Sequence, residues 1–109
     1  MNKVEQDTLN ARILRKMRLI SWDNSQGVHL QLTERAQDTD PIFDLFADSP
    51  QGAWSREKFV VWLGFSYDYY LHHFCGGWDV LDEYDNMVNG KPDLSYQKAV
   101  INVAQYIAK

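Results

Sequence analysis

Residues 54–78 read WSREKFVVWLGFSYDYYLHHFCGGW, the most apolar and aromatic stretch of the chain. Apolar side chains recur there at three- and four-residue spacing, which predicts an amphipathic helix from Arg56 to Phe74. Ser55 is a suitable N-cap, and Gly76-Gly77 is a typical helix stop. This helix is expected to be the centre of the core, and its inward face includes Phe59 and Trp62.

Helical patterns also flank this segment. Leu9, Ile13 and Met17 predict a helix from Thr8 to Leu19, capped by Asp7 or Thr8. Three further helices are expected. A short one runs from Asp40-Pro41 through Phe46 and is ended by residues 49–52, and a second runs from Trp78 to Val88. The last one is capped by Ser95 or Asp93, and its buried residues are Tyr96, Ala99, Val100, Val103 and Ile107.

The resulting fold class is mainly α, a small helical domain of four to five helices. Alternating apolar and polar residues over 28–33, after a turn at 23–27, add a short β-hairpin near residues 19–33 as an α+β variant. The 109 residues fit a single globular domain over 1–109. The most apolar segment carries Asp68 and two histidines and is too short to span a bilayer, so we expect no membrane partner.

Charge is distributed unevenly along the chain. Residues 1–20 carry a net +3, residues 21–90 a net −9 and residues 91–109 a net +2, which gives −4 in total. Such a field steers encounters with charged partners and does not determine fold. We therefore expect a protein partner with a basic surface, while the acidic middle makes nucleic acid an unfavourable one.

The run His72-His73-Phe74-Cys75 contains zinc-ligand atoms, as does nearby Asp79. On a helix, adjacent residues point about 100° apart, so the two histidines would not share a metal. Cys75 would lie at a helix C-terminus, where the helix dipole disfavours a thiolate nucleophile. We expect no metal, no cofactor and no catalytic residue. The lone cysteine and the polar N-terminal residues favour a reducing cytoplasm.

The best functional signal is the coincidence of aromatic and acidic residues after the central helix. Exposed Tyr and Trp beside charged side chains are typical anchors of protein interfaces. The alternative interpretation is a solvated helix face. The candidate partner-binding residues are Tyr67, Asp68, Trp78, Asp79, Asp82, Glu83, Tyr84 and Asp85.

The favoured hypothesis is a non-enzymatic interaction protein that binds and inhibits or regulates a protein partner. Immunity proteins, antitoxins, antagonists and phage inhibitors such as anti-CRISPRs share this size and charge, by analogy alone. The alternative is a small nucleic-acid-binding regulator that uses the basic face of the first helix. An enzyme built on Cys75 and a histidine is the third hypothesis, and homo-oligomerisation stays open. The basic face consists of Arg12, Arg15, Lys16 and Arg18.

Overall fold

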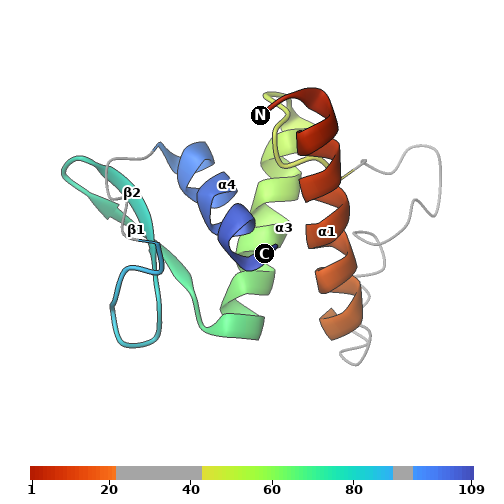
Figure 1. Cartoon of the computed structure of the whole chain (residues 1–109). Helices are drawn as coiled ribbons and strands as arrows, with labels where there is room; N and C mark the ends of the chain where they lie inside the picture. Colours follow the sequence, from red (N-terminus) through yellow and green to blue (C-terminus); the bar gives the residue numbers. More distant parts are fainter. Residues whose placement is uncertain (22–42, 90–94) are drawn as a thin grey trace. The chain divides into compact units, whose positions relative to one another are not determined.

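The computed structural model describes residues 1–21, 43–89 and 95–109 (Figure 1). In chain order its elements are α1 (Lys3–Ser21), α3 (Pro50–Tyr67), β1 (Tyr70–Phe74), β2 (Gly77–Leu81) and α4 (Tyr96–Ile107). The chain forms two compact units, Met1–Lys58 and Phe59–Lys109, and α3 runs from the first into the second.

The expected class of four to five helices is wrong. Over the described residues the structure has three helices and a two-stranded antiparallel sheet, an α+β architecture. The last five residues of the predicted central helix form β1, and the predicted helix 78–88 begins instead with β2. Of the hairpin expected near 19–33, residues 19–21 belong to α1, and the rest lies outside the described residues.

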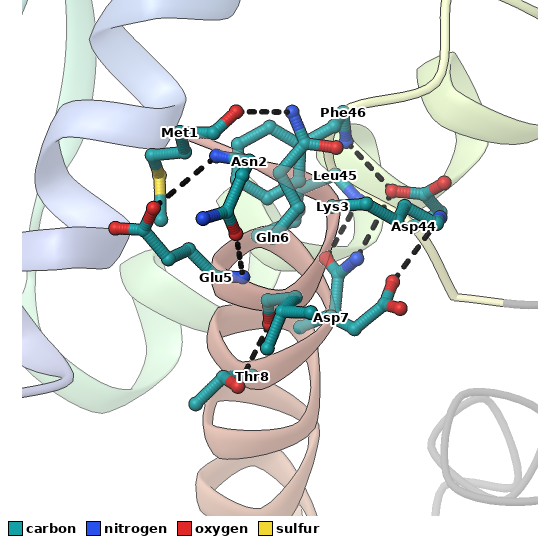
Figure 2. A network of polar contacts seen from close by, with 12 residues as sticks. Met1, Asn2, Lys3, Glu5, Gln6, Asp7, Thr8, Asp44, Leu45 and Phe46 are labelled. Carbon is teal, nitrogen blue, oxygen red and sulfur yellow. Dashed lines mark hydrogen bonds and ion pairs between the residues drawn. The ribbon is translucent and has the colours of Figure 1, made fainter.

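The start of α1 is fixed by a reciprocal capping box (Figure 2). The Glu5 backbone N–H donates to Asn2 Oδ1 at 2.8 Å, and the Asn2 N–H donates to Glu5 Oε1 at 3.3 Å. The helix therefore begins five residues before the expected start, and neither Asp7 nor Thr8 caps it. The Asn-x-x-Glu spacing was present in the sequence as a signal.

Within the first unit, residues 43–47 form a turn rather than the C-terminal part of a short helix. Asn10 holds this turn to α1: its Nδ2 donates to Asp44 Oδ1, and its Oδ1 accepts from the Leu45 N–H, both at 3.0 Å. Asp44 Oδ1 also accepts from the Phe46 N–H at 3.0 Å. Figure 2 shows this turn against the first part of α1.

The same turn is held to the start of α3. Ser55 is not a cap but a buried residue inside the helix, and its Oγ accepts from the Asp44 N–H at 3.0 Å. Arg56 is also buried, and its Nη1 donates to the carbonyls of Leu45 and Ala47, each at 2.9 Å. The helix begins earlier than expected because Pro50 occupies its first position, where a missing N–H carries no penalty.

In the second unit, α3 ends at Tyr67 rather than at Phe74. Asp68 adopts a left-handed conformation with φ 58°, and the Tyr69 N–H donates back to the Leu63 carbonyl at 3.3 Å. Aspartate tolerates this conformation better than most residues. The helical spacing continues past this point in the sequence, which is why the pattern alone did not locate the helix end.

The antiparallel hairpin pairs Tyr70 with Leu81 at one end and Phe74 with Gly77 at the other, so Cys75-Gly76 is the turn. Gly77 has φ 152°, a value that L-residues rarely adopt. The strand β2 contacts α4, which Ser95 caps as expected by accepting the Lys98 N–H at 3.2 Å. Of the stripe predicted for this helix, the fully buried residues are Ala99, Val100 and Val103.

Phe59 and Trp62 are buried, as the sequence predicted, with 0% and 1% of their surface exposed. Over the described parts of the chain, no helix is both long enough and apolar enough to cross a bilayer.

Candidate protein-interaction surface

Aromatic side chains follow the hairpin on both of its faces. Side chains alternate along a strand, so Tyr70, His72 and Phe74 share one face of β1. The ring centroids of His72 and Phe74 are 4.5 Å apart. On the opposite face His73 lies 4.8 Å from Trp78, which makes an edge contact with Tyr96 of α4 at 5.3 Å. Trp78 thus joins the hairpin to α4, while Tyr70, His72 and His73 remain exposed.

A compact loop, residues 82–86, follows β2. Asp82 Oδ1 accepts from the backbone N–H groups of Tyr84 at 2.8 Å and Asn86 at 3.0 Å. Asp85 takes a left-handed conformation with φ 63° and donates its N–H to the Asp82 carbonyl at 3.0 Å. A single carboxylate therefore organises the loop, so Asp82 has a structural role in addition to its charge.

At the tip of this loop Glu83 and Tyr84 extend into solvent, and Tyr84 has 75% of its surface exposed. Asp85 accepts a hydrogen bond from the Tyr70 hydroxyl. This bond raises the pKa of Tyr70 above its ordinary value of 10, because the phenol loses its donor proton on ionising. The bond connects the loop to the first residue of β1.

The other four candidate residues lie in different surroundings. Asp79 is only 2% exposed; its Oδ1 accepts the Val80 N–H at 2.7 Å, and its Oδ2 has no partner in the described parts of the structure. Tyr67 packs edge-on against Trp62 with centroids 5.5 Å apart, and Trp78 is half-buried. Asp68 is exposed at the end of α3. The structure therefore brings Glu83, Tyr84 and Asp85 together, and Asp79 lies in the interior.

Cys75 and the two histidines are not on a helix. His72 and His73 are neighbours on a strand and point to opposite faces, while Cys75 is exposed in the hairpin turn. The helix-dipole argument for Cys75 therefore falls, because there is no helix C-terminus there. No group of three or more metal-ligating side chains comes together in residues 1–21, 43–89 and 95–109.

The first unit contains a shallow hollow of about 260 Å³ between α1 and the 43–47 turn. The polar side chains that line this hollow bond to one another: Lys3 Nζ pairs with Asp7 Oδ1 at 3.1 Å, and Asn10 Nδ2 donates to Asp44 Oδ1. The Asn10–Asp44 bond joins the turn to the helix. The basic residues Arg12 and Arg15 are exposed on α1, and Lys16 is half-buried.

Sequence reasoning missed Tyr70 and the whole of β1 as parts of the surface. The signal was available: YLHHF and GWDVL are short runs with aromatic residues, separated by Cys75-Gly76. Such runs around a glycine-containing two-residue turn are typical of a β-hairpin. The three- and four-residue spacing of the aromatics favoured a helix instead.

Comparisons with protein-family models, with curated proteins and with solved structures find no match to this chain.

Proposed function

We propose that this protein is a non-enzymatic interaction protein that binds and regulates or inhibits a protein partner with a basic surface. The proposed contact surface is the acidic segment, defined as residues 68–89. It carries five carboxylates, of which only Asp79 is buried, and neither lysine nor arginine. A surface of one charge sign speeds association with a partner of the opposite sign and disfavours others.

The observation that carries the proposal is the exposed pair Glu83 and Tyr84 on a loop held by its own hydrogen bonds. A tyrosine with 75% of its surface exposed offers a large contact area with few rotatable bonds. The hydrogen bonds that Asp82 Oδ1 accepts and the Tyr70–Asp85 contact order the loop before any partner arrives. Preordered groups lose less entropy on binding, which favours affinity.

The position of each carboxylate in the structure decides which variants test the proposal. Asp82 organises the loop and Asp79 is buried, so charge reversal at either would disturb folding. The informative variant is Glu83→Lys combined with Tyr84→Ala. The matched control is Asp48→Lys, an exposed carboxylate in the first unit.

The partner is captured on the immobilised protein from its native cells, identified by mass spectrometry and purified. Its affinity is then measured for each variant at low and high salt. The double variant should bind at least about thirty-fold more weakly, the equivalent of a ~2 kcal/mol hot spot, and Asp48→Lys should bind normally. Equal affinity of the double variant and wild type would contradict the proposal. The proposal would also be contradicted if the wild-type protein captured nucleic acid and the double variant Arg12→Glu with Arg15→Glu did not.

A further inference from the structure

Within the described residues, β1 is the open edge of the two-stranded sheet. The edge of β2 that faces away from β1 is already hydrogen-bonded to residues 86–88. The Val88 N–H donates to the Val80 carbonyl at 2.9 Å, and the Asp82 N–H donates to the Asn86 carbonyl at 2.9 Å. Val80 thus directs its carbonyl away from β1. In an antiparallel pair the N–H and C=O of one residue point to the same side, so the facing residue Leu71 also points outward.

Alternation places His73 on the same outward side as Leu71, two residues along β1. Among the described residues no hydrogen bond reaches the backbone groups of Leu71 or His73 on that side. In the part of the chain that the structure describes, two N–H donors and two carbonyl acceptors therefore have no partner, in the spacing that a neighbouring strand requires.

The residues of β1 themselves carry none of the features that prevent strand pairing. Natural sheets protect exposed edges with lysine, inward-pointing charges, proline or bulges. The strand sequence YLHHF carries neither proline nor a formally charged side chain, and its pairing with β2 is continuous over all five residues. An unprotected edge of this kind is a template for an added strand.

The charges around β1 decide which kind of added strand would pair with it. Asp68 lies two residues before β1, and Asp85 is bonded to Tyr70 at the first residue of the strand. Glu83 is exposed on the same loop as Asp85. Pairing with β1 of a second copy would bring another Asp68, Glu83 and Asp85 to the edge, whereas a basic segment would meet charges of opposite sign.

We propose that β1 accepts an extended, lysine- or arginine-containing segment of the partner as an added strand, paired through the backbone of Leu71 and His73. This inference rests on the proposed function for the choice of a basic protein partner, and it adds the mode of recognition. The basic side chains of the occupant lie toward the Tyr70 end of the strand, near Asp68 and Asp85. Toward the Phe74 end the occupant places apolar side chains, because that end offers an aromatic ring and no charge.

The experiment uses a short synthetic valine–lysine peptide, with the lysines in one half and only valines in the other, added to the full chain. Amide hydrogen exchange and NMR chemical shifts are followed residue by residue. The expected result is slowed exchange at Leu71 and His73, with no change at the already bonded amides of α4. One control peptide replaces each lysine with glutamate. The other is the valine–lysine peptide N-methylated at every residue, which keeps the charges but has no N–H on either edge with which to pair as a strand.

A matched pair of variants tests the charge selection. Asp68→Asn with Glu83→Gln removes two exposed charges, and asparagine tolerates the left-handed backbone of residue 68. Asp48→Asn is the control. The first variant should bind the basic peptide roughly two- to fivefold more weakly per charge removed at low salt, the range for exposed ion pairs.

Three outcomes would overturn the inference: binding of the N-methylated peptide as tightly as its parent, binding without protection of Leu71 and His73, or protection produced by raising the protein concentration alone. The last would assign the edge to a second copy. If the peptide fails but the captured partner still depends on Glu83 and Tyr84, the strand pairing falls and the proposed function stands. If the peptide pairs but no protein partner depends on that loop, the proposed function falls instead.

Discussion

The Tyr70 hydroxyl donates a hydrogen bond to Asp85 Oδ1, fifteen residues further along the chain. It joins the first residue of β1 to the loop that follows β2. The loop geometry around Glu83 and Tyr84 therefore depends in part on a residue of the open edge strand.

The first prediction concerns the ionisation of Tyr70. The hydrogen bond to Asp85 raises the pKa of this phenol, so the contact stabilises the folded loop below pH 10 and is lost as the pH rises through the raised value. In Asp85→Asn, Tyr70 should ionise at lower pH than in wild type. Ultraviolet absorbance of tyrosinate during an alkaline titration measures this, with Tyr70→Phe identifying the transition. An unchanged Tyr70 transition in Asp85→Asn would contradict the bond.

The second prediction compares two glycines of one helix. A Cβ added at Gly52 would lie 1.8 Å from the Ala47 carbonyl oxygen, whereas one added at Gly64 would meet nothing nearer than the Tyr69 carbonyl oxygen at 3.8 Å. Gly52→Ala should therefore lower the free energy of unfolding by about 1–3 kcal/mol or more, since backbone must move. Gly64→Ala should raise it by about 0.5–1 kcal/mol through helix propensity. Denaturant unfolding of both variants tests the contrast, and equal stabilities would refute it.

The third prediction concerns the core part of α3. Trp62→Ala should lower the free energy of unfolding by about 3–5 kcal/mol, because the side chain is 1% exposed. Phe65→Ala, on the same helix with 74% of its surface exposed, should change it by less than about 0.5 kcal/mol. Thermal melts followed by circular dichroism distinguish the two. A Trp62→Ala melting temperature within a degree or two of wild type would mean that this helix is placed wrongly.

The fourth prediction concerns the attachment of the 43–47 turn to α1. Asn10→Ala removes both hydrogen bonds of the Asn10 side chain and leaves the buried Leu45 N–H without its acceptor. The expected loss is about 1–3 kcal/mol of unfolding free energy, the usual cost of an unsatisfied buried donor. Exchange of the Leu45 amide should accelerate strongly in this variant. If that amide keeps its protection, Asn10 is not what holds the turn.

The sequence predicted the helices that begin and end the chain better than it predicted the middle. The stripe Leu9, Ile13 and Met17 is buried in α1, and Ser95 caps α4, because both signals are local. The hairpin was missed because the aromatic spacing of residues 59–74 fits a helix, and the helix end at Asp68 depends on a left-handed backbone. Nothing in the spacing marks that conformation.

The candidate surface was predicted by composition and not by geometry. Glu83, Tyr84 and Asp85 do lie together, but on a loop that Asp82 organises rather than on a helix face. Asp79 was misjudged as exposed because burial of a strand residue depends on long-range packing, which a local charge pattern does not contain. The open edge of β1 depends on which strand lies outside, and this too is a property of topology.

The hairpin turn holds Cys75, the single thiol of the chain, exposed between β1 and β2. A maleimide dye would therefore attach at one defined position, at the tip of the proposed pairing edge. Its emission would report on occupancy of β1 in real time, with the native sequence unaltered and the 82–86 loop unlabelled. The protein thus carries a built-in attachment point for fluorescence measurements of its own recognition strand.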